Sequence, residues 1–192
     1  ELRIDGIDNP TPQLAREIIE EINFPTIATN RVQSEGGFFK GSEEERVDIL
    51  LETCDVAKYV DIELQTDSDL ISEITKGNAK TIISFHDFKK TPSLNELLDI
   101  VNQEHVLGDI AKVALMPNNL EDTLTVLAIL SHCEDTIAIS MGDVGSYTRV
   151  IATKFNAPIT FAVSNDVTAP GQIDIETMKL LLNMDIMDID KL

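Results

Sequence analysis

The sequence predicts an α/β fold, a (βα)8 barrel of the TIM type, from two observations. Strand-like apolar runs alternate with helical periods along all 192 residues, which is typical of a parallel sheet covered by helices. Several strands also alternate in polarity; in residues 59–64, for example, Asp61 and Glu63 interrupt the apolar positions. Strands of an open, doubly wound sheet read as nearly unbroken apolar runs. The alternation therefore favours a barrel whose polar side chains face its interior near the mouth.

The expected strands occupy seven ranges in chain order: 2–4, 25–31, 59–64, 81–86, 110–116, 136–141 and 158–163. Apolar residues at helical spacing follow the strands, as in Leu14, Ile18 and Ile22. Ser42 with Glu45 matches a capping box at the start of a helix. A barrel needs eight strands, so we expect the first strand to precede Glu1. No linker composition divides the chain, and we expect one domain over residues 1–192.

Composition excludes several classes of function. The net charge is −19, which repels nucleic acid and anionic membrane surfaces. No run of 18 apolar residues is present, so no membrane span is expected. The two cysteines, Cys54 and Cys133, suggest neither a disulfide framework nor a metal cluster. The light cysteine usage favours a reducing cytoplasm.

The most informative residue is Lys112, which lies in the apolar run at 110–116. Desolvating an ammonium group there is costly, and burial lowers a lysine pKa. A neutral amine is a nucleophile toward carbonyl carbon. His86, at the end of the run at 81–86, is placed to move the protons that imine chemistry needs. The alternatives are a lysine whose ammonium group reaches water or pairs with an interior carboxylate, and a histidine satisfied in the interior.

Other polar residues lie near the ends of expected strands, where barrel enzymes carry their sites. In the loop after residues 25–31, Glu35 is placed to hold the tautomer of an imidazole, although a solvated loop acid is the alternative. Arg149 follows the strand at 136–141 and is suited to a bidentate carboxylate contact, unless it is a surface helix residue. Gln172 follows the last strand and suits hydroxyl groups. We expect the alternating positions to point inward, namely Glu1, Arg3, Thr29, Arg31, Asp61, Glu63, Ser84, His86, Lys112, Met141 and Phe161.

Taken in order, these motifs resemble type I 3-dehydroquinate dehydratase, the Schiff-base form, over essentially the whole chain. The motifs are Glu1-Leu2-Arg3-Ile4-Asp5, Thr29-Asn30-Arg31 with Glu35-Gly36-Gly37, Asp61-Ile62-Glu63, Ser84-Phe85-His86-Asp87, Ile110-Ala111-Lys112, Ser140-Met141-Gly142, Arg149, Thr160-Phe161-Ala162 and Ala169-Pro170-Gly171-Gln172. Two features depart from the family pattern. The family's first strand, which normally supplies a serine near the substrate, is absent here, and Thr168 stands where a serine is usual.

The resemblance implies a (βα)8 barrel, usually a homodimer, that dehydrates 3-dehydroquinate to 3-dehydroshikimate in the shikimate pathway of aromatic amino-acid synthesis. It places the imine on Lys112, general acid–base catalysis on His86 and the orienting acid on Glu35. It implies no metal and no cofactor beyond the covalent imine with the substrate. The substrate-binding groups it implies are Glu1, Arg3, Arg31, Arg149, Thr168 and Gln172, with Met141 and Phe161 shaping the pocket.

Two other functions remain open from the residues alone. A class I aldolase or transaldolase would share the barrel and the lysine imine but break a C–C bond. The turn from Gly142 to Gly145 would then hold a phosphate, although Arg149 with Gln172 suits a carboxylate and hydroxyls better. A non-catalytic barrel that binds small carboxylates is the other alternative.

Overall fold

The computed structural model describes residues 1–164 and 169–184. The chain forms two compact units, which we describe separately. The first comprises Glu1–Asp87 and Asn95–Val113, and the second comprises Phe88–Leu94 and the chain from Ala114 onward. Within the described residues, no helix is long and apolar enough to cross a membrane.

The first unit contains a parallel sheet in which strands follow one another in chain order. Its strands are β1 (Leu2–Arg3), β2 (Ile27–Thr29), β3 (Tyr59–Glu63), β4 (Lys80–Asp87) and the first part of β5 (Ile110–Leu115). The first three pairings are parallel, with Ile62 of β3 opposite Ile83 of β4. Parallel neighbours joined by helical crossovers are the repeating βα pattern that the alternation predicted.

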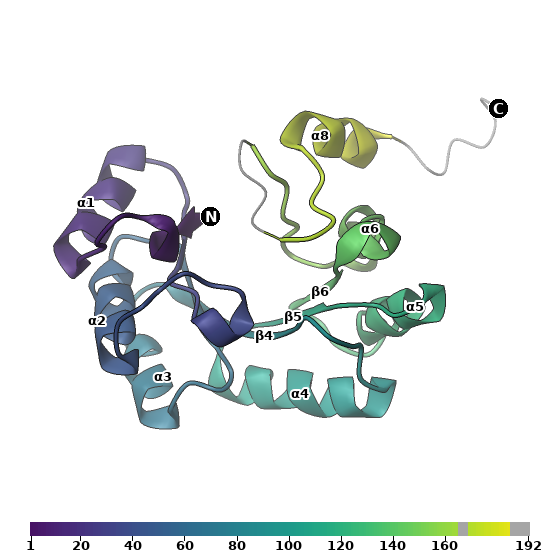
Figure 1. Cartoon of the computed structure of the whole chain (residues 1–192), viewed down its shortest axis with the longest axis horizontal. Coiled ribbons are helices and arrows are strands. Elements are labelled where there is room, and N and C mark those ends of the chain that lie inside the picture. Colours follow the sequence, from purple (N-terminus) through teal and green to yellow (C-terminus); the bar gives the residue numbers. More distant parts are fainter. Residues whose placement is uncertain (165–168, 185–192) are drawn as a thin grey trace. The chain divides into compact units, whose positions relative to one another are not determined.

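The helices of the first unit are α1 (Pro12–Ile22), α2 (Glu43–Thr53), α3 (Ser68–Ile74) and α4 (Leu94–Leu107). Figure 1 shows α1, α2 and α3 stacked one after another beside the strands that they connect. Short 3-10 turns, η1 (Ile4–Gly6) and η2 (Gln33–Glu35), follow β1 and β2. The predicted capping box at Ser42 and Glu45 is present, with both reciprocal hydrogen bonds.

One face of β3 is apolar, and the other carries Asp61 and Glu63. Val60 and Ile62 are fully buried against a core cluster that includes Ala15 and Ile19 of α1 and Leu50 of α2. The alternate positions of the strands carry polar side chains that are also buried, namely Thr29, Asp61, Glu63, Ser84 and Lys112. The alternation in the sequence therefore separates an apolar layer under the helices from a polar interior.

The second unit contains the end of β5, β6 (Thr136–Ser140) and the helices α5 (Leu120–Ile129), α6 (Gly142–Gly145), α7 (Thr148–Ile151) and α8 (Ile175–Asn183), with a 3-10 turn η3 (Ala152–Phe155). β6 neighbours β5 in the sheet, and Met141 donates its N–H to the Leu115 carbonyl over 2.8 Å. The Thr148 hydroxyl accepts the Ser140 N–H and donates to the Gly145 carbonyl, which holds α7 against the end of β6.

The strand predicted at 158–163 does not form. Val163 makes an isolated parallel bridge to Asp174, donating its N–H to Ile173 and accepting the N–H of Ile175. Pro158 has no N–H to donate to a ladder, and the Thr160 hydroxyl is bonded to the Arg149 carbonyl over 2.7 Å. The apolar pattern of this segment reflects packing within the second unit, and the segment is not a regular strand of the described chain.

Candidate active site

Lys112 lies at the centre of the buried polar cluster of the first unit. Its Nζ is 2.7 Å from Oδ2 of Asp61, and the side chains are 6% and 0% exposed. The other oxygen of Asp61, Oδ1, accepts hydrogen bonds from Arg31 Nη2 and from the Ser84 hydroxyl, both over 2.7 Å. The side chains of Lys112 and Asp61 therefore form a buried ion pair.

Arg31 connects this pair to a second carboxylate. Its Nη1 donates to Glu63 Oε1 over 3.0 Å and to the Ser84 hydroxyl over 2.7 Å. Glu63 in turn lies 2.7 Å from Nη1 of Arg46, a fully buried residue of α2. Breaking such a buried network leaves an uncompensated charge, which costs about 3–5 kcal/mol. The network therefore holds the guanidinium of Arg31 in one place.

Glu35 and His86 form a second buried pair. The Nδ1 atom of His86 is 2.7 Å from Glu35 Oε2, and the backbone N–H of His86 donates to the same oxygen over 3.1 Å. A tight turn delivers Glu35 to this position from the end of β2. A Cβ on Gly37 would lie 1.9 Å from the Arg31 carbonyl oxygen, so only glycine allows the chain to fold back so closely.

Burial is the main reason why both groups of this pair titrate away from their ordinary ranges. Burial raises the pKa of Glu35 to about 8, and the carboxylate of Glu63 adds to the rise. Burial also lowers the pKa of His86 well below its ordinary value, helped by the cations of Arg31 and Lys112. When Glu35 is protonated, its carboxyl group donates to Nδ1, and Nε2 carries the ring proton. Once Glu35 ionises, Nδ1–H donates to the carboxylate and Nε2 has a free lone pair.

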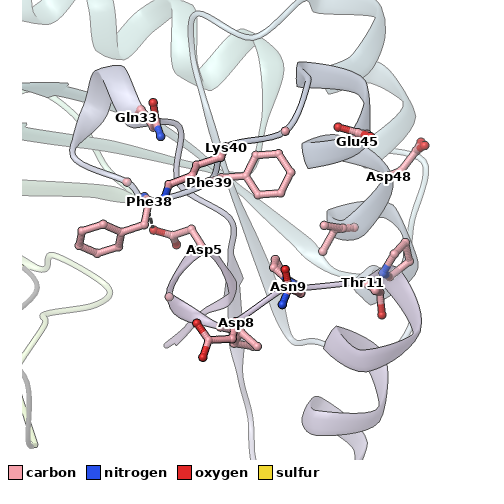
Figure 2. Close-up of a pocket in the computed structure, with 17 residues that line it drawn as sticks. Asp5, Asp8, Asn9, Thr11, Gln33, Phe38, Phe39, Lys40, Glu45 and Asp48 are labelled. Carbon is pink, nitrogen blue, oxygen red and sulfur yellow. Dashed lines mark hydrogen bonds between the residues drawn. The ribbon is translucent and has the colours of Figure 1, made fainter.

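Asp5 organises the neighbouring turn. Its carboxylate accepts two hydrogen bonds from Arg3, over 2.9 and 2.7 Å, and one from each backbone N–H of Arg31 and Phe38. Burial alone would raise the pKa of Asp5, but the Arg3 guanidinium holds it below its ordinary value. Figure 2 shows Asp5 beside Phe38, with their hydrogen bond as a dashed line. Arg3 is therefore held in place by an acid that also fixes the turn leading to Glu35.

A cavity of about 860 Å³ is lined in part by residues of this turn, among them Gln33 and Phe38. Figure 2 draws its lining, in which Phe38 and Phe39 lie near Lys40, and Asp8, Glu45 and Asp48 surround the remaining space. Lys112, His86 and Glu35 are not among the lining residues. The cavity therefore shares Asp5 with the buried polar cluster but does not contain the residues suited to covalent chemistry.

Arg149 is the corresponding buried cation of the second unit. It is 2% exposed, and its Nε and Nη2 donate to the carbonyls of Gly171 and Pro170 over 3.1 and 3.4 Å. Among the described residues no carboxylate forms an ion pair with it, and burial lowers its pKa to about 10. A buried guanidinium without an acidic partner is chemically suited to bind an anion.

The loop that carries Gln172 packs against Gly142 through Gly171. The Gly142 N–H donates to the Pro170 carbonyl over 3.1 Å. Gly171 has φ +70°, and a Cβ on it would lie 2.1 Å from the Gly142 carbonyl oxygen. The amide oxygen of Gln172 accepts the N–H of Ala169 over 3.2 Å. The backbone of this loop is thus positioned by an approach that only glycine permits.

A model of the type I 3-dehydroquinase family matches residues 1–189. The chain belongs to the type I 3-dehydroquinase family. It is 67% identical to a 3-dehydroquinate dehydratase of Methanobrevibacter smithii, over 97% of this chain and 83% of the relative. It is 51% identical to the enzyme of the same name from Methanothermobacter thermautotrophicus, over 95% and 82%.

Solved structures of type I 3-dehydroquinases confirm the predicted fold class. A Clostridium difficile type I 3-dehydroquinate dehydratase with covalently modified comenic acid has a TM-score of 0.86 and 29% identity, covering 94% of this chain and 79% of that chain. The 3-dehydroquinate dehydratase of Aquifex aeolicus has a TM-score of 0.82 and 30% identity, over 94% and 84%. The fold is therefore that of these TIM-barrel-like enzymes.

The residues that resemblance to the 3-dehydroquinases singled out are divided between the two units. Lys112, Arg31, His86, Glu35 and Arg3 belong to the first unit, where Glu1 also accepts the Thr29 hydroxyl over 2.9 Å. Arg149, Gln172, Met141 and Phe161 belong to the second unit, where Met141 is buried and Phe161 is half-buried. Thr168 lies outside the described residues.

Sequence reasoning assigned no role to several residues that hold the site together. Asp61, Ser84 and Glu63 were expected to point inward, but their shared contacts with Lys112 and Arg31 could not be read from alternation. Asp5 lay within a quoted motif, and its position two residues after Arg3 was the available signal. Arg46 directly follows the Ser42–Glu45 capping box, which gave no signal of its contact with Glu63. Among the described residues, no group of three or more potential ligands is placed to hold a metal ion.

Proposed function

We propose that the chain is a 3-dehydroquinate dehydratase, a hydro-lyase that acts through an imine on Lys112. Membership in the type I 3-dehydroquinase family and relatives named for this activity support the dehydratase over an aldolase. The buried amine of Lys112, close to the buried Glu35–His86 pair, is the observation that carries the mechanism. The reaction needs no cofactor beyond the covalent adduct.

In this mechanism the amine of Lys112 attacks the ketone carbon of 3-dehydroquinate, after giving up one proton to a neighbouring base. His86 moves protons through the carbinolamine, whose oxygen leaves as water to give the protonated imine. The imine withdraws electrons from the adjacent carbon, and Nε2 of His86 removes the C–H proton to give an enamine. The enamine expels the β-hydroxyl as water with a proton from His86. Hydrolysis then releases 3-dehydroshikimate.

Glu35 acts on this chemistry through His86. An ionised Glu35 accepts Nδ1–H, which leaves Nε2 as the base and stabilises the imidazolium that forms. In the same scheme Arg149 binds the substrate carboxylate, and Glu1, Arg3, Arg31, Thr168 and Gln172 bind its polar groups. Met141 and Phe161 supply apolar surface. The lack of an acidic partner for Arg149 among the described residues supports the carboxylate assignment.

Trapping with borohydride tests the mechanism directly. We expect the wild-type chain, incubated with 3-dehydroquinate and borohydride, to gain the mass of a reduced adduct at Lys112 and to lose activity. Lys112→Ala should fold but give neither adduct nor turnover. Lys76→Ala is the matched control, since that lysine is exposed and forms a surface ion pair with Glu73 of α3. Near-normal dehydration by Lys112→Ala would show that Lys112 is not the nucleophile. An adduct whose mass corresponds to a fragment of a cleaved sugar would indicate an aldolase.

The active form in this proposal is a cytoplasmic homodimer. Two exposed leucines, Leu120 (61%) and Leu124 (57%), lie one turn apart on α5 and present an apolar strip. The free cysteines Cys54 and Cys133 suit a reducing compartment. We expect light scattering after size exclusion to give the mass of two chains for the wild type and of one chain for Leu124→Asp. A monomeric wild type at micromolar concentration would contradict the dimer.

A further inference from the structure

Asp61 contacts the atom that would carry the imine. Its Oδ2 lies 2.7 Å from Lys112 Nζ, while Oδ1 is occupied by the Arg31 guanidinium and the Ser84 hydroxyl. One oxygen of the carboxylate is thus committed to fixed donors of the protein, and the other faces the reacting nitrogen. Neither residue of the pair is accessible to bulk water, since Asp61 is 1% and Lys112 5% exposed.

The charge on this nitrogen is the same before and after imine formation. An ammonium group and a ketone become a protonated imine and one water molecule. The C=N bond replaces the C=O bond, and two of the three ammonium protons leave with the oxygen as water. Nζ keeps one N–H and a single positive charge. A carboxylate placed for the ammonium is therefore already placed for the protonated imine, with no reorganisation of the site.

We propose that Asp61 is a catalytic residue that serves as the counter-ion of the protonated imine on Lys112. This inference rests on the proposed function. Asp61 accepts the one N–H that the imine nitrogen retains and keeps that nitrogen charged, so that it can withdraw electrons from the adjacent carbon. Removal of the C–H proton makes the nitrogen neutral, and expulsion of the β-hydroxyl restores its charge beside Asp61. The carboxylate therefore favours the step in which water is lost.

The surroundings keep Asp61 ionised throughout. Burial alone would raise its pKa, but the Arg31 guanidinium and the Lys112 ammonium hold the pKa of Asp61 below its ordinary value. Other titratable groups also face the pair, namely Glu63 from β3, His86 from β4, Glu35 from η2 and Glu104 from α4. Burial raises the pKa of both Glu35 and Glu104, which leaves Asp61 as the permanently charged acid in contact with Nζ.

The test compares Asp61→Asn with Glu63→Gln. Both replacements turn a buried acid of β3 into an amide of the same shape, and both acids share Arg31. Glu63 also forms an ion pair with Arg46, whereas Asp61 also forms one with Lys112. Each protein is incubated with 3-dehydroquinate and cyanoborohydride, which reduces the protonated imine preferentially. Trapped adduct by intact mass and the rate of dehydration are measured from pH 6 to pH 10.

We expect Asp61→Asn to form adduct near pH 6 but to lose both trapping and dehydration at a pH about one to three units below the wild type. Glu63→Gln should keep the wild-type upper limit. Ser84→Ala removes one donor to Asp61, and it should lower the upper pH limit by a smaller amount. If circular dichroism shows that Asp61→Asn is unfolded, the Ser84→Ala variant becomes the test. An unshifted upper pH limit in Asp61→Asn overturns the inference, and Ser84→Ala is judged in the same way where it replaces that variant. An equal shift of the limit in Glu63→Gln also overturns the inference. A wild type that yields no adduct overturns the proposed function itself.

Discussion

His86 and Glu35 are joined twice through one oxygen atom. Oε2 of Glu35 lies 2.7 Å from the ring nitrogen Nδ1 and 3.1 Å from the backbone nitrogen of the same histidine. The backbone contact fixes where the carboxyl group sits relative to β4, and the ring contact fixes how the imidazole is turned. Both side chains are largely shielded from bulk water, at 9% and 6% exposed.

His86→Ala should separate the chemical steps. We expect the variant to form the imine slowly and to lose about 10²- to 10⁴-fold in dehydration rate, since the base that removes the C–H proton is absent. Adduct mass after borohydride and the absorbance of the conjugated product measure the two steps. His132→Ala, at an exposed position, is the matched control. Undiminished steady-state dehydration by His86→Ala would contradict the role of this histidine.

The free energy of unfolding should decrease as the pH rises, because of Glu35. Its pKa is raised to about 8 in the folded chain, so between the unfolded value and pH 8 the folded state holds a proton that the unfolded state has lost. His86, whose folded pKa is lowered, acts in the opposite direction only below its unfolded pKa of about 6.5. From pH 6.5 to pH 8 the Glu35 contribution alone therefore lowers the free energy of unfolding, by about 1–2 kcal/mol.

Glu35→Gln should remove this decrease in the free energy of unfolding. Urea unfolding of the variant and of the wild type, at several pH values between 6.5 and 8, measures the free energy of unfolding of each protein. Glu104, whose pKa burial also raises, contributes equally to both proteins and cancels in the difference. A constant difference in stability across this range would show that Glu35 is ionised in the folded chain at neutral pH.

Arg149→Lys should weaken substrate binding without removing a positive charge. Lysine is a point donor and cannot bond the carbonyls of Gly171 and Pro170 while presenting a planar fork to a carboxylate. We expect KM to rise about tenfold or more, a loss of about 1.4 kcal/mol of binding. Arg16→Lys is the control, because Arg16 pairs with Glu20 and Glu52 on the surface. An unchanged KM would place the substrate carboxylate elsewhere.

Gly171→Ala should displace the loop that carries Gln172. The added Cβ would meet the Gly142 carbonyl at 2.1 Å, and φ at this position is +70°. We expect the variant to lose about 1–3 kcal/mol of stability and to show a raised KM. Gly6→Ala should change neither, since nothing lies within 4 Å of a Cβ there. Wild-type kinetics and stability for Gly171→Ala would show that the glycine contact does not position the loop.

Part of the site was predictable from local patterns. A lysine within an apolar strand, a histidine at the end of a strand and polar residues at alternate strand positions are features of the chain itself, and they indicated where Lys112, His86 and Asp61 would lie. The same reasoning failed at 158–163, because an apolar run has the same appearance whether it pairs as a strand or packs without a ladder. Val163 makes only an isolated bridge there.

The sequence by itself determined the order of βα elements, the polar interior of the strands and, through the order of its motifs, the family. Only the tertiary structure decided which charges meet, such as Asp61 with Lys112 and Arg31, Glu63 with Arg46, and Glu35 with His86. The physical reason is that alternation and helical period are local to each segment. The partner of a buried charge depends instead on the register between strands 20 to 50 residues apart.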